Sequence, residues 1–420
     1  MRLSQLFTKT SKTVPADETA KNAKLLIQAG FIHKEMAGVY SFLPLGLKVL
    51  NNIAAIIRQE MDAIGGQEIY MPALQLKERY ELSGRWDDKV VDNWFKTKLT
   101  NGHELGLGFS HEENLSPLVK NFVTSYKDLP IAPYQIQTKF RNELRSKSGL
   151  MRGREFLMKD MYSFALTAKQ HEDFYQKAQA AYDKIYNRLG IGDRTLLTFA
   201  SGGSFSKYSH EFQTLSEAGE DTIYLSRDKK LAVNKEVMSD EILDELRLKK
   251  DELEEARAIE VGNIFSLGTK FSDPFELTVA NEKGQPVTLL MGCYGIGVSR
   301  AMGTIAEVLS DAKGLVWPKS VAPALVYLAR LGDDLKVVKI ADELYKELTA
   351  RNIGVLYDDR VLRPGEKFAD ADLMGIPERV VISDKTVTTN RYEVKGRSEP
   401  EPQYLERHEL LQKLGVGDPN

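Results

Sequence analysis

The chain has 420 residues, 28% charged and 42% hydrophobic, with a net charge of −3, as in ordinary globular proteins of two or three domains. This balance lacks the strong basicity of proteins that bind nucleic acid by bulk charge, so any RNA contact must come from local patches. Apolar runs such as Val321–Ala329 are shorter than the roughly 20 residues of a membrane span. A single cysteine, Cys293, excludes an internal disulfide and a multi-cysteine zinc site, and favours a reducing cytoplasm. Residues 1–14 contain no acid, as in organelle transit peptides, but show no clear amphipathic pattern.

In the first half of the chain, hydrophobic spacing predicts a helix, a strand and a hairpin. Apolar residues at spacings of three and four predict an amphipathic helix over Pro44–Ile64, which Gly65-Gly66 ends. Glu68–Pro72 then reads as a short strand closed by proline. Tyr134–Phe140 and Glu155–Phe164 flank a short polar loop, which predicts an antiparallel hairpin.

The middle of the chain combines a helix, a charged segment and a glycine-rich turn. Ala168–Leu189 is expected to be helical. Charge dominates Thr222–Ala258, and acids and bases alternate at helical spacing from Asp240 onward, which predicts a solvated helical hairpin. Further on, we expect a strand at Thr288–Met291 that runs through a glycine-rich turn into a helix at Ser299–Leu309.

After Trp317-Pro318 the pattern changes to alternating strands and helices, which predicts a separate small α/β domain. The expected order is strand, helix, strand, helix and strand, at Ala324–Arg330, Asp334–Ala350, Gly354–Asp358, Phe368–Leu373 and Arg379–Ile382. The sequence therefore predicts two domains, at residues 1–317 and 318–420.

The predicted hairpin carries side chains suited to a nucleotide. Arg141 and Glu143 end its first strand, and Arg152, Phe156 and Asp160 follow at a strict spacing of four. On a strand, that spacing places all three on one side. Arginines can neutralise phosphates and Phe156 can stack on adenine. A surface hairpin with salt bridges would have the same composition.

A second pattern is GCYGIGVSR at Gly292–Arg300. A glycine-rich turn before a helix lets backbone approach a phosphate. It differs from the dinucleotide fingerprint, because Arg300 stands where the third glycine would be. Arg300 is placed to bind a terminal phosphate.

Together with the helix and strand ending at Pro72, these two patterns resemble, in the right order, the three signature motifs of class II aminoacyl-tRNA synthetases. Within that class the chain resembles the bacterial prolyl-tRNA synthetases along nearly its whole length. The matching segments are PLGLKVL (Pro44–Leu50), SGRW (Ser83–Trp86), GLMRGREFLMKDMYSF (Gly149–Phe164), SHEF (Ser209–Phe212), GED (Gly219–Asp221), GCYGIGVSR, YDDR (Tyr357–Arg360) and GEKFADADLMGIP (Gly365–Pro377).

The resemblance implies an α/β (α+β) fold, with a class II catalytic domain on an antiparallel sheet followed by an α/β anticodon-binding domain. It implies the cofactors ATP and Mg²⁺, without zinc, and the partners L-proline and tRNA(Pro) in a cytoplasmic homodimer joined through the first motif. The charged segment Thr222–Ala258 stands where the family usually carries a large editing domain, so no cis-editing of alanyl-tRNA is expected.

The resemblance also assigns roles to single residues. Arg141 and Arg300 are the expected catalytic residues. The ATP-binding set is Arg141, Glu143, Arg152, Phe156 and Arg300, and the proline-binding set is Ser110, Glu112, Arg141, His210 and Cys293. Glu211 would lie near magnesium, and Arg145 and Lys147 would touch the tRNA acceptor end. Phe109-Ser110 replaces the family's usual Pro-Thr, which retains the hydroxyl but removes the rigidity of proline.

Two other interpretations remain. Seryl, glycyl and histidyl synthetases share the class motifs, whereas the threonyl enzyme needs a zinc site with a cysteine and histidines, and the sole cysteine lies in the glycine motif. A catalytically inactive synthetase-like binding protein is the other possibility, against which the intact motif arginines argue.

Overall fold

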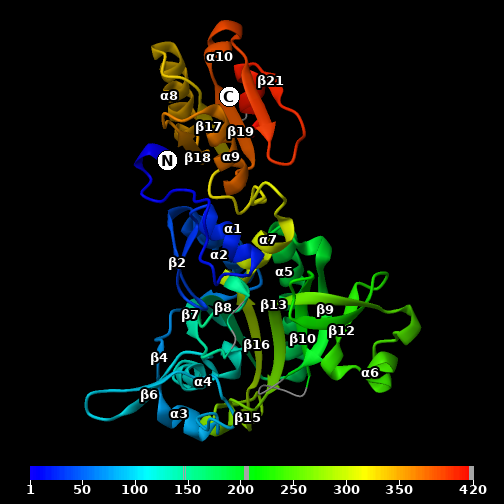
Figure 1. Cartoon of the computed structure of the whole chain (residues 1–420). Coiled ribbons are helices and arrows are strands. Elements are labelled where there is room, and N and C mark those ends of the chain that lie inside the picture. Colours follow the sequence, from blue (N-terminus) through cyan, green and yellow to red (C-terminus); the bar gives the residue numbers. More distant parts are fainter. Residues whose placement is uncertain (145, 147, 203–207, 416–420) are drawn as a thin grey trace. The chain divides into compact units, whose positions relative to one another are not determined.

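The computed structural model describes residues 1–144, 146, 148–202 and 208–415, which fall into two compact units (Figure 1). One unit comprises residues 36–39 and 53–304, and the other comprises residues 1–35, 40–52 and 305–420 as far as described. In the described part of the chain, no helix has the length and apolar character needed to cross a membrane.

The unit of residues 53–304 is built on a nine-stranded, mostly antiparallel sheet in the order β10-β9-β12-β11-β13-β16-β8-β7-β3, in which β10 also pairs with β13 (Figure 1). These strands are β3 (Gln67–Glu68), β7 (Pro133–Phe140), β8 (Glu155–Ala165), β9 (Thr195–Ser201), β10 (Tyr208–Leu215), β11 (Asp221–Ser226), β12 (Leu231–Asn234), β13 (Glu254–Gly268) and β16 (Leu290–Gly297).

Smaller elements surround this sheet. A three-stranded sheet has the order β4-β6-β5, and β14 pairs with β15. The bounds are β4 (Leu74–Leu76), β5 (Lys96–Lys98), β6 (Glu104–Leu107), β14 (Thr278–Ala280) and β15 (Pro286–Thr288), with helices α3 (Lys77–Leu82), α4 (Glu112–Lys120), α5 (Ala168–Arg188) and α6 (Asp240–Glu245).

In the other unit a five-stranded sheet has the order β18-β17-β19-β20-β21. The strands are β17 (Val326–Arg330), β18 (Val355–Asp358), β19 (Glu378–Ile382), β20 (Tyr392–Gly396) and β21 (Gln403–Leu405), and the helices are α1 (Lys21–Gln28), α8 (Leu335–Ala350), α9 (Pro364–Met374), α10 (Asp384–Thr389) and α11 (Arg407–Lys413). Elements that the unit boundaries cross or adjoin are β1 (Ile32–Met36), β2 (Val39–Phe42), α2 (Pro44–Ala63) and α7 (Val298–Leu309).

The two faces of the large sheet have different partners. In β8, alternate residues place Phe156, Asp160 and Tyr162 on one face and Lys159 on the other. The second face packs against α5, where Lys159 meets Tyr182. The first face is therefore the one that carries the polar side chains predicted to form a site.

Most predicted elements are confirmed. The long helix is α2, the hairpin is β7 with β8, and the helix after it is α5. The alternation after Trp317 is also present, from β17 to β19.

The prediction of a helical hairpin over residues 222–258 is wrong. The segment forms β11, β12 and the start of β13, and α6 is its one α-helix. Ile223 and Leu225 on β11 are buried and pack against Ala232 and Ala258. Burial of these alternating apolar residues in the sheet outweighs the helical propensity of the charged residues around them.

The prediction of a glycine-rich turn before the helix at Ser299–Leu309 is wrong as well. The glycines lie inside β16, and α7 follows directly at Val298. They are needed for space, since a Cβ on Gly295 would lie 2.7 Å from Asn263 Oδ1 and one on Gly292 would lie 2.4 Å from the Tyr294 hydroxyl. Small residues here let neighbouring polar groups approach the strand.

Candidate active site

A cavity of about 220 Å³ lies beside the end of the β7–β8 hairpin and β13. Its lining is rich in charge and comes from four separate stretches of the chain. The lining residues are Arg141, Glu143, Ser148, Met151, Arg152, Ala218, Glu220, Asp221, Ala258, Ile259, Glu260 and Arg300. A second, smaller hollow shares Arg141, Arg152 and Arg300 and adds Phe156. All five residues of the predicted ATP-binding set therefore lie together.

Arg141 is the cation best placed to receive an anion. Its guanidinium carbon lies 5.4 Å from the centre of the Phe156 ring. Among the described residues it forms no ion pair. Desolvation by burial, reinforced by the neighbouring Arg300, lowers the pKa of Arg141 from its usual value. A partly buried positive charge beside a second one favours binding of a polyanion such as a triphosphate.

Arg300 reaches the cavity from the first turn of α7. Its Nη1 donates to the Glu260 carbonyl at 2.8 Å and lies 3.0 Å from Glu260 Oε2. The backbone N–H groups at the start of α7 add positive potential at the same end of the helix. Glu260 thus holds Arg300 while leaving part of its guanidinium for a ligand.

Arg152 differs from its prediction in one respect. It precedes β8, so it does not share a strand face with Phe156 and Asp160 as its spacing suggested. Its Nη2 lies 2.8 Å from Glu143 Oε2, and Glu220 pairs with its Nη1. The carboxylates of Glu143 and Glu220, and not the position of Arg152 on a strand, therefore hold its guanidinium in the cavity wall.

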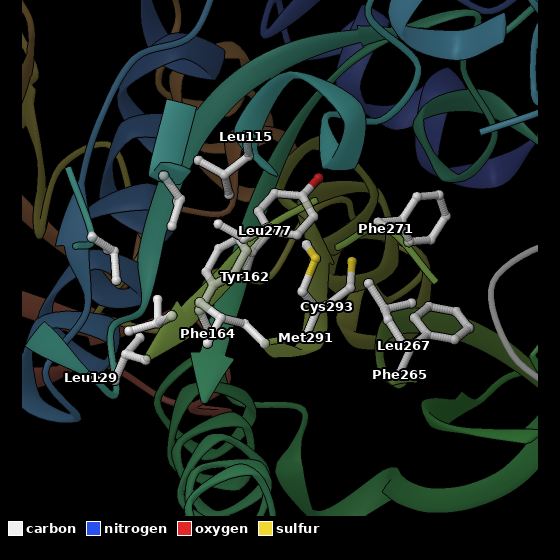
Figure 2. Close-up of a cluster of buried hydrophobic side chains, with 14 of the residues drawn as sticks. Leu115, Leu129, Tyr162, Phe164, Phe265, Leu267, Phe271, Leu277, Met291 and Cys293 are labelled. Atoms are coloured by element: carbon white, nitrogen blue, oxygen red, sulfur yellow. The ribbon is translucent and has the colours of Figure 1, made fainter. Parts of the chain in front are cut away.

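The expected amino-acid-binding residues Ser110, Glu112 and Cys293 form a second, buried group. The Ser110 hydroxyl donates to Glu112, and Cys293 Sγ lies 3.5 Å from Glu112 Oε1. Figure 2 shows Cys293 beside Met291 and Tyr162 in an apolar cluster. Burial, followed by the charge of Glu112, raises the pKa of the Cys293 thiol well above its usual range, so the thiol is protonated.

His210 and Glu211 lie on opposite faces of the sheet, because consecutive strand residues alternate. His210 Nδ1 is 2.7 Å from the hydroxyl of Tyr175 on α5. The structure therefore does not bring His210 together with Glu112 and Cys293, contrary to the expectation for a proline-binding residue. The SHEF motif alone does not indicate on which face of the sheet His210 lies.

Glu211 points to the face that carries Glu260. Burial and the charge of Glu260 raise the pKa of Glu211 to about 8. Gln213 donates to Glu211 Oε2 at 2.8 Å and to Asp221 Oδ2 at 2.7 Å. In the parts of the chain that the structure describes, no cluster of three or more His, Cys, Asp or Glu side chains has the arrangement of a metal site. The two residues expected to touch the acceptor end, Arg145 and Lys147, lie outside the described residues.

Sequence reasoning missed the buried groups that hold the Ser110–Glu113 loop. Lys139 Nζ is 2.8 Å from Asp160 Oδ1 and 2.8 Å from His111 Nδ1. Burial, assisted by the charge of Lys139, lowers the pKa of His111 to about 4, so its ring is neutral. Arg85 pairs with Glu112 and Glu113. Arg85 lies in the SGRW segment that carried the resemblance, but nothing in its spacing indicated a carboxylate partner.

Two family models match the chain. The tRNA synthetase class II core domain (G, H, P, S and T) matches residues 95–309, and an anticodon binding domain matches residues 325–415. A Proline--tRNA ligase of Zymomonas mobilis subsp. mobilis is 40% identical over 99% of both chains. The chain belongs to the proline--tRNA ligase family of class II synthetases. A Proline--tRNA ligase of Rickettsia bellii is 38% identical over 96% of this chain and 95% of its own.

Solved structures of the family share the fold. Giardia lamblia prolyl-tRNA synthetase in complex with prolyl-adenylate matches with a TM-score of 0.78 at 18% identity, over 93% of this chain and 75% of that one. The Cryptosporidium parvum enzyme complexed with L-proline and AMP matches with a TM-score of 0.76 at 19% identity, over 94% and 74% of the two chains. A class II core and an anticodon-binding domain are therefore the two components of this chain.

Proposed function

We propose that this chain is a proline--tRNA ligase that uses ATP to activate proline and transfers it to the 3′ end of tRNA(Pro). Membership of the family supports the reaction. The observation that carries the site is Arg141, a partly buried guanidinium that makes no ion pair within the described chain and faces a cavity with Arg300.

In the first step, the proline carboxylate attacks the α-phosphorus of ATP in line with the leaving pyrophosphate. The products are prolyl-adenylate and pyrophosphate, and no covalent bond to the enzyme forms. Arg141 and Arg300 neutralise the charge that develops on the α-phosphate, while Arg152 binds the outer phosphates. Phe156 stacks on adenine. A terminal ribose hydroxyl of the tRNA then attacks the adenylate carbonyl, and AMP leaves.

Magnesium fits the carboxylates on the same sheet face. Burial and the charge of Glu260 raise the pKa of Glu211, so a cation bound beside these two carboxylates would favour the ionised form of Glu211. These two residues would hold Mg²⁺ bound with ATP, and the ion would add positive charge at the phosphates.

The proline pocket comprises Ser110, Glu112, Arg141 and Cys293. Glu112 receives the ammonium group of proline, and Arg141 lies at the carboxylate, where the two substrates react. The thiol of Cys293 is protonated, so Cys293 adds no charge to the pocket wall. The pocket thus separates an acidic end for the ammonium from a basic end for the phosphate.

Residues 318–420 form the anticodon-binding domain, and residues 1–317 the catalytic domain. The match of residues 325–415 to an anticodon binding domain supports this division. Truncation before Pro318 tests it, because the activation residues all precede that position. The truncated protein should keep proline-dependent exchange and lose charging of tRNA(Pro), and equal loss of both in a folded protein would show that the division is wrong.

The active form is a cytoplasmic homodimer joined near α2. Tyr70 and Leu74, which follow β3, are 78% and 52% exposed, and their apolar surface supports a protein partner there. In this proposal no editing domain interrupts the catalytic domain, and the short strands and helices between β11 and β13 support it. Charging of purified tRNA(Pro) with labelled proline tests the overall function. A protein that charges another tRNA, or none, would contradict the proposal.

A further inference from the structure

His111 stands between Ser110 and Glu112 in the loop that is proposed to bind the amino acid, and its ring is fully buried. The ring Nε2 lies 3.2 Å from the Pro72 carbonyl oxygen. On its other side, the ring Nδ1 lies 2.8 Å from Lys139 Nζ. Both ring nitrogens are therefore within hydrogen-bond distance of groups on other segments of the chain.

These two contacts fix the position of the ring proton. Burial lowers the pKa of Lys139, but the Asp160 carboxylate, whose Oδ1 lies 2.8 Å from Lys139 Nζ, opposes this and favours the ammonium form. An ammonium group only donates, so Nδ1 of His111 carries the lone pair and accepts. Nε2 then carries the hydrogen and donates it to the Pro72 carbonyl, which can only accept. The ring is thus the neutral Nε2–H tautomer.

Pro72 belongs to a segment that buried side chains of β7 hold in place. Gln135 Oε1 accepts from the Met71 N–H at 3.1 Å, and Gln137 Nε2 donates to the Met71 carbonyl at 2.7 Å. Both glutamines are buried, and the strand that carries them leads directly to Arg141. The Pro72 carbonyl is therefore fixed relative to the strand that carries the proposed phosphate ligand.

Gly108 leaves the space that the ring occupies. A Cβ at this position would lie 2.8 Å from His111 Cε1 and 3.3 Å from His111 Nε2. The Gly108 N–H donates to the Ala73 carbonyl at 2.8 Å, and the Gly108 carbonyl accepts from the Phe140 N–H at 3.0 Å. Because this backbone is hydrogen-bonded on both sides, a larger residue at position 108 would displace the ring from Pro72.

We infer that His111 is a positioning residue, which as the Nε2–H tautomer ties its loop to the Pro72 carbonyl and so places the Glu112 carboxylate for the ammonium group of proline. The inference rests on the proposed binding of proline at Ser110 and Glu112. His111 itself does not touch the substrate. Its bond to Pro72 governs the affinity for proline, and Lys139 governs which ring nitrogen makes that bond.

The loop has further attachments, which should allow variants of His111 to fold. The Ser110 carbonyl accepts from Gln75 Nε2 at 2.6 Å and from the Tyr80 hydroxyl at 2.9 Å. Loss of the bond to Pro72 should therefore shift the loop locally and leave the fold intact. The KM for proline should rise, whereas the kcat and the KM for ATP should change little, because the proposed phosphate ligands lie on other elements.

Proline-dependent ATP–pyrophosphate exchange on the full chain tests the bond to Pro72. His111→Asn keeps an acceptor for Lys139 in place of Nδ1 but is too short to reach Pro72, so its KM for proline should rise roughly tenfold, about the value of one hydrogen bond. His111→Gln can place an amide N–H where Nε2 stands, so its KM should stay within about threefold of the original chain. Equal KM values for the two variants, or a loss confined to kcat, would overturn the inference.

Gly108→Ala tests the same bond without changing the histidine. The added methyl should push the ring from Pro72 and raise the KM for proline. In the double variant Gly108→Ala/His111→Asn the colliding ring atom is gone, so its KM should lie within about twofold of that of His111→Asn alone. Effects that multiply, or an unchanged KM in Gly108→Ala, would overturn the inference. The second of these results decides the matter even if His111→Asn fails to fold.

A substituted surface histidine provides the matched control. His103 lies on the surface with its Nε2 2.9 Å from Glu78 Oε1. His103→Asn should leave the KM for proline unchanged. A rise equal to that of His111→Asn would show that the effect is not specific to the buried ring, and would overturn the inference.

Nitrogen NMR of histidine-labelled protein tests the tautomer without any substrate. The ring signal that is missing from His111→Gln should be that of a neutral ring with its hydrogen on Nε2, and a hydrogen on Nδ1 would overturn the inference. Absence of proline-dependent exchange in the original chain would refute the proposed function, and the inference with it. Normal exchange in the original chain, with an unchanged KM in His111→Asn, would refute the inference alone.

Discussion

At the scale of single residues, Arg141 and Arg300 are the proposed ligands of the α-phosphate. Replacing either with alanine should reduce adenylate formation by roughly two to three orders of magnitude, because one lost donor in a preorganised site costs about 3–4 kcal/mol. Pyrophosphate exchange measures the loss, and circular dichroism checks that the fold is retained. Exchange within about tenfold of the original chain, for either variant, would exclude that arginine as a phosphate ligand.

Lys159 offers a second prediction, on the opposite face of the sheet. It is fully buried, donates to the Tyr182 hydroxyl at 2.7 Å and to the Tyr294 carbonyl at 2.9 Å, and its burial lowers its pKa to about 7. Between that value and its usual pKa near 10.5, the unfolded chain binds more protons than the folded one. Lys159 therefore makes stability rise with pH through this window.

Lys159→Met removes this dependence. The gap in unfolding midpoint, taken as the original chain minus the variant, should increase as the pH rises from 7 to 9.5. Urea unfolding at the two pH values measures it. An equal gap at both would show that Lys159 has an ordinary pKa in the folded protein.

The contacts of single residues show which parts of the candidate site could be predicted from the sequence and which could not. Arg141, Glu143, Arg152, Phe156 and Arg300 were predicted to lie together and do, because hairpin and helix positions follow from local pattern. The pairing of Arg85 with Glu112 was not predicted, since it joins residues 27 positions apart through packing. The contact of His210 with Tyr175 was not predicted either, because the sequence motif does not show on which face of the sheet a strand residue lies.

At the scale of elements, Gly46 in α2 is required by a close approach. A Cβ at this position would lie 2.0 Å from the Phe31 carbonyl oxygen. Helix propensity alone predicts that Gly46→Ala gains about 1 kcal/mol, whereas the clash predicts a loss of roughly 1–3 kcal/mol. Thermal unfolding should show a lower midpoint.

Gly365 in α9 provides the matched control in the same unit of the chain. It is exposed, and a Cβ there would meet nothing within 4 Å. Gly365→Ala should therefore leave the free energy of unfolding unchanged or raise it by up to about 1 kcal/mol, so the thermal midpoint should not fall. A higher midpoint for both variants would mean that propensity, and not the contact with Phe31, governs α2.

Elements also show why part of the fold was not predicted. Long amphipathic helices such as α2 and α5 are local patterns, and their limits were predicted to within one or two residues. The segment from Asp240 to Ala258 reads locally as a helix, yet its C-terminal part pairs with β11 across the sheet. Pairing between distant strands is not encoded in local charge spacing.

At the scale of the whole molecule, the proposed absence of an editing domain has a consequence. A proline pocket cannot exclude the smaller alanine sterically, and each missing methylene lowers binding by only about 1–3 kcal/mol. We expect the enzyme to activate alanine measurably and to leave alanyl-tRNA(Pro) intact. Incubation with pre-formed alanyl-tRNA(Pro) tests this, and deacylation clearly above the rate without enzyme would show that some part of the chain edits.

The central claim is that the cavity of Arg141, Phe156 and Arg300 activates proline with ATP. ATP–pyrophosphate exchange with each of the twenty amino acids in turn tests it most directly. The account predicts the highest kcat/KM with proline, a much lower value with alanine, and loss of the proline signal in Arg141→Ala. Exchange that is fastest with another amino acid, or absent with all twenty in a folded protein, would contradict it.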